Sequence, residues 1–167
     1  MSSQARQKPV LLMVTGEFPP FKGGAGRYAA QVSSAFSRCG LKVAVLAPPA
    51  SDPTVYLGTE SGSRMQVYDE FDAADPFAAG RCLYRHMVRC SHVMLADARA
   101  VRIFRYFPRP WRPYSILVHG TEVWELLDPA RASIPEVQRR RVRRLYQCAE
   151  RLICNSSPTR KLLHEAG

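Results

Sequence analysis

The sequence predicts an α/β fold in which a doubly wound parallel sheet carries helices on both faces. Six short apolar runs alternate along the chain with segments whose apolar residues recur at helical spacing. The runs are continuous, as in strands that helices cover on both sides. With 167 residues, 46% of them hydrophobic, the chain has the size of one compact domain. We expect residues 9–167 to form this domain and residues 1–8 to be a flexible N-terminus.

The first half of the chain predicts three strands and two helices. Apolar residues over 28–39 follow one helical face, and Gly40 stands where a helix C-terminus favours glycine. The second helix is expected over 77–89, after a loop rich in Gly, Ser and Pro over 49–63. Four apolar residues of that helix are expected to face the sheet: Phe77, Tyr84, Met87 and Val88. The expected strands are 10–15, 42–47 and 65–68.

The second half repeats the alternation. A helix is expected from the fourth strand to about Phe107, and Ser133 and Glu136 have the spacing of a capping box before the next helix. Ser157 and Pro158 suit the N-cap and first position of a last helix. The expected strands are 93–96, 114–118 and 152–154. The helix after Ser133 is amphipathic, with one apolar face of Ile134, Val137, Val142, Leu145, Tyr146 and Ala149, and Arg139, Arg140, Arg143 and Arg144 largely opposite.

Composition excludes several classes of protein. The five cysteines form no C-x-x-C pair, which argues against a disulfide framework or a structural zinc site and favours the cytoplasm. The first apolar run, 10–14, is too short for a signal peptide, and no run approaches the roughly 18 residues of a membrane span. The formal net charge of +10 attracts polyanions of any kind, or reflects solvated arginine faces.

Four polar segments follow predicted strands and therefore share one rim of the sheet. They are 16–27, Asp97, 119–122 and 155–157. In open parallel sheets, ligands bind beyond the carboxyl ends of the strands, near the point where the strand order reverses. The sequence thus places the candidate binding site at this rim.

The segment 16–27 is a loop with two adjacent prolines, followed by glycines at a helix start: Gly23, Gly24 and Gly26. Glycines let backbone amides approach a ligand, and a helix N-terminus carries about half a positive charge. A diphosphate suits such a site, although a flexible turn into the helix is the structural alternative. The spacing Gly24-x-Gly26-x-x-Ala29 matches the dinucleotide fingerprint only formally, because no acidic residue ends the second strand.

Three stretches together resemble a known family. They are LLMVTGEFPPFKGGAGRYAAQVSSAFSRCGLKVAVLAP over 11–48, SILVHGTEVW over 115–124 and RLICNSSPTRKLLHEAG over 151–167. Their order and spacing are similar to the family-4 retaining glycosyltransferases, whose GT-B architecture joins two Rossmann-like domains. The resemblance spans nearly the whole chain and implies a single Rossmann-like domain, the N-terminal, acceptor-side half of a GT-B fold.

The resemblance implies hexosyl transfer from a nucleoside diphosphate sugar to an acceptor, with retention of configuration. Gly23 and Gly24 would contact the donor through backbone amides, and His119 would lie beside the transferred sugar as the catalytic residue. Glu122 would orient His119 or cap the following helix. Where relatives carry histidines after the fourth strand, this chain has Asp97, which changes the polarity of the acceptor pocket. The remaining candidates are Gly26, Arg27, Asn155 and Ser156. Arg27 would either meet phosphate or cover the helix start. Asn155 and Ser156 would either contact the ligand or form a turn at a helix start.

The resemblance also implies which other components take part. The nucleotide sugar is a co-substrate, and we expect no cofactor and no metal, since no D-x-D carboxylate pair occurs. The family's second domain carries two glutamates in E-x7-E spacing, which these residues lack. We therefore expect negligible activity from this chain alone and a C-terminal domain or partner chain that completes the site.

A second hypothesis makes the chain a basic membrane- or partner-binding module that keeps the fold without catalysis. Relatives that act on lipid-linked acceptors touch the cytoplasmic membrane face through basic surfaces. Here the segments 104–111 and 139–144 are rich in arginine. We expect a cytoplasmic protein, peripheral on the inner face of the plasma membrane, unless these arginines are merely solvated. Nucleic acid is a poor candidate partner, because no recognised nucleic-acid motif is present.

Overall fold

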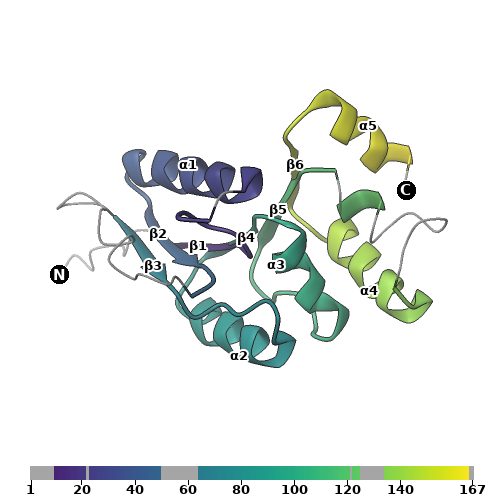
Figure 1. The fold of residues 1–167 in the computed structure, drawn as a ribbon, viewed down its shortest axis with the longest axis horizontal. Coiled ribbons are helices and arrows are strands. Elements are labelled where there is room, and N and C mark those ends of the chain that lie inside the picture. The colour runs from purple at the N-terminus through teal and green to yellow at the C-terminus, as the bar shows by residue number, and fades with distance from the viewer. Residues whose placement is uncertain (1–9, 22, 50–63, 121, 125–133, 166–167) are drawn as a thin grey trace, which may run out of the picture.

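A six-stranded parallel sheet forms the centre of the molecule, with strand order β3-β2-β1-β4-β5-β6. The computed structural model describes residues 10–21, 23–49, 64–120, 122–124 and 134–165. Figure 1 shows α1 and α5 on one side of the sheet and α2, α3 and α4 on the other. The elements are β1 Val10–Val14, α1 Gly24–Arg38, β2 Lys42–Leu46, β3 Met65–Tyr68, α2 Pro76–Met87, β4 His92–Leu95, α3 Ala98–Arg102, the short 3-10 helix η2 Ile103–Arg105, β5 Tyr114–Val118, α4 Glu136–Gln147, β6 Arg151–Cys154 and α5 Ser157–Glu165.

The central strand β1 explains why its sequence is continuously apolar. Leu11 and Met13 pack in the core beneath α1, whereas Leu12 and Val14 pack in the core shared with α2, α3 and α4. Side chains of a strand alternate between faces, so a strand covered on both sides needs apolar residues at every position. All five parallel pairings are present, and the predicted doubly wound α/β class is confirmed.

The strand predictions agree with the structure to within one residue at each end. The helix α1 starts at Gly24, among the glycines expected at a helix start and one turn before the apolar periodicity that begins at Tyr28. Its C-terminus is as predicted. Gly40 has φ +87, its amide donates to the Ser37 carbonyl and the Leu41 amide to the Phe36 carbonyl, which is a Schellman motif.

Two predicted helix faces are partly wrong. Phe77 and Val88 of the α2 region are 62% and 57% exposed, and Val137 of α4 is 66% exposed. These residues lie in the first turn or at the C-cap of their helices. Phe77 instead packs edge-on against Phe107, with ring centroids 5.7 Å apart. The side chains that do cover the sheet are Ala79, Cys82, Leu83 and Met87 from α2 and Val142, Leu145 and Tyr146 from α4.

Two predicted helix caps also differ from the structure. The helix α4 starts at Glu136 with Pro135 as its N-cap and no side-chain cap, while Ser133 lies outside the described residues. The N-cap of α5 is Ser156, one residue before the predicted one, and its Oγ accepts from the Thr159 amide at 3.2 Å. Residues 1–8 and most of the predicted loop 49–63 also lie outside the described part of the chain. None of the described helices is both long and apolar enough to cross a bilayer.

Candidate functional site

The carboxyl ends of β1 and β4 meet where the strand order reverses, and Asp97 joins them. Its Oδ2 accepts from the Thr15 hydroxyl at 2.7 Å and from the Gly16 amide at 2.6 Å. Its Oδ1 accepts from the Ala100 amide at 2.8 Å and so caps α3. The residue is 5% exposed. Both carboxylate oxygens therefore serve the protein, which makes Asp97 a residue that positions the glycine loop rather than one that faces a ligand.

His119 follows β5 and is held from two sides. Its Nε2 lies 2.8 Å from the Ala96 carbonyl, which can only accept, so this nitrogen carries the proton. The ring stands edge-on to Tyr28 of α1, with centroids 5.6 Å apart and an interplanar angle of 87°. In the neutral imidazole, Nδ1 is then the acceptor. The contacts fix His119 between β4 and the helix that begins at the glycine loop.

Glu122 holds the backbone of the turn that carries His119. Its Oε1 accepts from the His119 amide at 2.7 Å, and the residue is 1% exposed. Between them, Gly120 has φ +110, which a side chain would strain. This bond to the amide three residues earlier has the spacing of a capping box, so it serves both roles that the sequence offered for Glu122: it holds the backbone of His119 and caps the helix start.

The three glycines of the loop have three different surroundings. Gly23 is the N-cap of α1, where no side chain caps the helix. A Cβ on Gly24 would meet nothing within 4 Å, and the residue is exposed. A Cβ on Gly26 would lie 3.0 Å from the Glu17 carbonyl carbon, so this glycine serves close packing of α1 on its own loop. Arg27 is exposed on the first turn.

Glu17 lies at the same helix N-terminus, although no pattern in the sequence predicted a role for it. A Cβ on Gly23 would collide with the Glu17 carboxylate, and the other carboxylate oxygen lies 3.6 Å from Arg99 Nη2. Arg99 also donates to the Gly16 carbonyl at 3.1 Å. A cavity of about 260 Å³ lies here, lined by Gly16, Glu17, Phe21, Gly23, Pro48 and Arg99. His119 is not among the residues that line it.

Asn155 and Ser156 form the turn into α5. Besides the Ser156 cap, the Thr159 hydroxyl lies 2.9 Å from Asn155 Oδ1 and 3.4 Å from the His119 carbonyl. Of the two sequence-based interpretations, this geometry favours the helix-start turn. The turn ties β6 to the end of β5 and so supports His119 from a third side.

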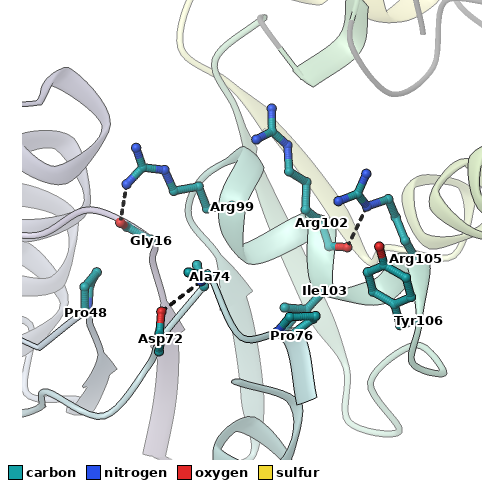
Figure 2. Close-up of a pocket in the computed structure, with 11 residues that line it drawn as sticks. Gly16, Pro48, Asp72, Ala74, Pro76, Arg99, Arg102, Ile103, Arg105 and Tyr106 are labelled. Carbon is teal, nitrogen blue, oxygen red and sulfur yellow. Dashed lines mark hydrogen bonds between the residues drawn. The ribbon is translucent and has the colours of Figure 1, made fainter. Parts of the chain in front are cut away.

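A larger cavity of about 450 Å³ adjoins the glycine loop and shares Gly16, Pro48 and Arg99 with the smaller one. Its opposite wall is the turn before α2, with Asp72 and Pro76 (Figure 2). Three arginines of α3 and η2 line it: Arg99, Arg102 and Arg105. This cluster was not predicted from the sequence, although its members recur at every third residue.

One group of potential metal ligands occurs among the described residues, away from the glycine loop: Glu70, Cys82 and His86, with ligand atoms within 4.8 Å of one another. Glu70 already pairs with Arg85 and, at 2.6 Å, with His86 Nε2. The hydrogen bond from His86 is the main cause that lowers the pKa of Glu70. Burial raises the pKa of Cys82 to about 11, so its thiol stays protonated at neutral pH. The group fits an ion-pair cluster better than a metal site.

The strand order, the parallel pairings and the glycine-rich helix start at the switch point define a Rossmann-like α/β domain. Residues 22–167 match Glycosyltransferase Family 4. The chain belongs to this family, which confirms the resemblance seen in the sequence, and its fold is that of the N-terminal half of a GT-B enzyme. Among curated proteins, none matches the chain. The chain is thus a glycosyltransferase domain that acts on a sugar donor and an acceptor.

Proposed function

We propose that this domain forms the acceptor-side wall of a retaining hexosyltransferase that uses a nucleoside diphosphate sugar. The N-terminus of α1 carries the proposal, because no side chain caps it, Gly24 is exposed there, and its N-cap Gly23 lines a cavity. The first amides of a helix lack intrahelical partners and attract anions. The donor diphosphate would take the place at this helix end that the Glu17 carboxylate holds.

The chemistry requires stabilisation of charge more than a strong base. When the bond between the sugar and the diphosphate breaks, the electron pair goes to the diphosphate and the sugar becomes oxocarbenium-like. Fixed dipoles and cations stabilise the leaving group, and the α1 terminus and Arg99 supply both. His119 Nδ1 would accept from a hydroxyl of the transferred sugar, because Nε2 is held by Ala96. The acceptor hydroxyl would attack the same face of the sugar and give its proton to a diphosphate oxygen.

The described residues supply only part of such a site. No two glutamates of the sequence have E-x7-E spacing, and among the described residues only Glu17 and Arg99 bring charge to the lining of the cavity at the glycine loop. We therefore propose that a second domain or a partner chain grips the nucleotide, and that this chain alone turns over no nucleotide sugar. Binding without turnover is the expected behaviour of the isolated chain.

Replacement of Gly24 tests the donor site without disturbing the fold. In Gly24→Val, the new side chain has room in the protein but would cover the helix amides. We expect the free energy of unfolding of this variant to stay within about 0.5 kcal/mol of that of the parent chain. We also expect it to bind adenosine, guanosine or uridine diphosphate glucose at least roughly tenfold more weakly in an NMR titration. The matched control is Gln31→Val, which adds the same side chain to an exposed position of α1.

Two results would contradict the donor proposal. The first is equal binding of these nucleotides to Gly24→Val and to the parent chain. The second is a set of amide shifts that omits Gly23 and Gly24. Turnover of any nucleotide sugar by the 167-residue chain would contradict the proposal that a second wall is needed.

A second candidate function is contact with an anionic membrane surface, and one observation favours it. The two arginine-rich segments of the sequence meet in the structure, where a cavity of about 400 Å³ joins Tyr106–Arg109 to Arg141 and Arg144. Trp111, two residues after Arg109 of the cavity lining, is 54% exposed. Not every predicted arginine is available, because Arg139 and Arg140 pair with Glu136. The surface combines aromatic and cationic groups, as membrane-peripheral proteins do.

A further inference from the structure

The 450 Å³ cavity lies beside the candidate donor site without being part of it. Figure 2 shows the side chains of Arg99, Arg102 and Arg105 leaving α3 and η2 on one side, across from Asp72. The volume is within the range of small-ligand pockets. Because the two cavities share Gly16, Pro48 and Arg99, a molecule bound here would adjoin a sugar bound at the glycine loop.

The charges of the cavity favour an anion. Three arginines line it, and Asp72 is the one acidic residue among the lining residues that the structure describes. Glu17, which does not line this cavity, compensates Arg99 from the side of the glycine loop at 3.6 Å. Asp72 itself accepts from the Ala74 amide at 2.9 Å, within its own turn. Like charges that line one cavity repel one another, and a bound anion relieves the repulsion.

The side chains of Arg99 and Arg105 are held in place by the protein. Arg99 donates to the Gly16 carbonyl, and Arg105 Nε donates to the Arg102 carbonyl at 3.3 Å. The Arg105 guanidinium carbon lies 5.5 Å from the centroid of the Tyr106 ring, and the Arg105 carbonyl accepts from Arg141 at 3.1 Å. Guanidinium groups that are already oriented lose less side-chain entropy when they bind an oxyanion.

We propose that this cavity binds a phosphoryl group of the acceptor, and that the acceptor is a hydroxylated phosphate ester. Arginine forks match phosphoryl oxygens in geometry and charge. The Asp72 carboxylate and the Tyr106 hydroxyl, on the walls of the same cavity, suit the acceptor's hydroxyl groups. That the ligand is the acceptor rests on the proposed transferase function, whereas the binding of a phosphate ester rests on the cavity alone.

Two sources of the phosphoryl group share this chemistry, a soluble sugar phosphate and a lipid headgroup. The cavity shares Tyr106 with the aromatic cavity lined by Phe107 and Pro108, so an attached apolar chain would have a surface to follow. The test therefore uses glucose 1-phosphate in solution and, separately, vesicles of phosphatidylcholine with and without phosphatidic acid.

Binding is measured by NMR amide shifts at low ionic strength for the parent chain and for Arg102→Gln, Arg105→Gln and Arg81→Gln. Arg81 is exposed on α2 and lines neither cavity, so its variant matches the charge change. Glucose 1-phosphate should shift amides of residues 98–106, and glucose should not. We expect about tenfold weaker binding in each of the two cavity variants, because each loses a charge-assisted bond, and no change in Arg81→Gln.

Equal affinity of the parent chain and both cavity variants would overturn the proposal, as would shifts confined to other residues. A thermal melt of each variant separates lost binding from lost fold. Saturation by glucose 1-phosphate identifies a soluble ester, and stronger binding to phosphatidic acid vesicles identifies a headgroup. Nucleotide-sugar shifts at Gly23 and Gly24 report on the proposed function independently. If those are present and the 98–106 shifts are absent, only the inference about the acceptor fails.

Discussion

At the scale of single residues, the buried carboxylates of the rim act on backbone amides. Asp97 and Glu122 are 5% and 1% exposed, and each accepts from the main chain of a rim loop. The sequence correctly placed both acids at the rim, but it could not show which way they point. Orientation depends on loops that are distant in sequence, such as the one that contains Gly16, 81 positions before Asp97.

Loss of the Asp97 side chain should destabilise the fold more than loss of an ordinary helix cap. Asp97→Ala leaves the Gly16 and Ala100 amides without their buried acceptor and the Thr15 hydroxyl with the Glu17 carbonyl alone. We expect a cost of about 3 kcal/mol in the free energy of unfolding, measured in urea. The control is Asp75→Ala, an exposed N-cap of α2 that should cost about 1 kcal/mol. Equal costs for the two variants would contradict the bridging role of Asp97.

His92 makes stability depend on pH. Burial lowers the pKa of His92 below its usual 6.5, while the nearby Glu150 carboxylate opposes that shift. As the pH falls through 6.5, the unfolded chain binds the proton first, so the free energy of unfolding decreases until the folded pKa is passed. His92→Gln keeps a hydrogen-bonding group near Ser115 and should flatten this dependence between about pH 7.5 and 5.5. The exposed control His164→Gln should show the same slope of the free energy of unfolding against pH as the parent chain. If His92→Gln also shows that slope, His92 is not the source of the pH dependence.

At the scale of elements, apolar runs predicted the strands well, because each strand is buried on its two faces. Helix ends were harder to predict. The first turn of α1 consists of small residues that carry no periodicity, and Phe77 looked like a core residue although it packs on Phe107 of a distant loop. The arginine cavity was not predictable for a similar reason. Its other wall is the turn that contains Asp72, and only the fold brings that turn to α3.

The start of α1 offers a prediction in which two glycines behave oppositely. Gly26→Ala places a Cβ 3.0 Å and 3.1 Å from backbone atoms of Glu17 and Phe18, so the loop must shift. We expect it to destabilise the fold by roughly 1 to 3 kcal/mol. Gly24→Ala meets nothing and should stabilise α1 by up to about 1 kcal/mol. Thermal and urea unfolding of both variants measures these changes in the free energy of unfolding. Changes of the same sign in the two variants would contradict the close packing of Gly26 against its loop.

At the scale of the whole molecule, the strand order decides which loops meet. Because β1 lies between β2 and β4, the glycine loop faces the start of α3. The same topology gathers arginines from α3, η2 and α4 on the face of the sheet opposite α1 (Figure 1). Part of the net charge of +10 is therefore concentrated on this face, where arginines line two adjoining cavities.

The aromatic and arginine-rich cavity predicts a preference for anionic membranes that depends on where charge lies. Arg109→Gln with Arg144→Gln removes two cations from that cavity, and Arg38→Gln with Arg81→Gln removes two exposed cations elsewhere. Each arginine near an anionic surface contributes about 1 kcal/mol, so the first pair should weaken binding to phosphatidylserine vesicles by roughly tenfold or more. The second pair should have little effect, although both proteins have the same net charge. Co-sedimentation at low salt measures this. Equal losses of binding in the two double variants would show that the chain responds to net charge alone. Equal binding of the parent chain to neutral and to anionic vesicles would show that it has no preference for anionic membranes.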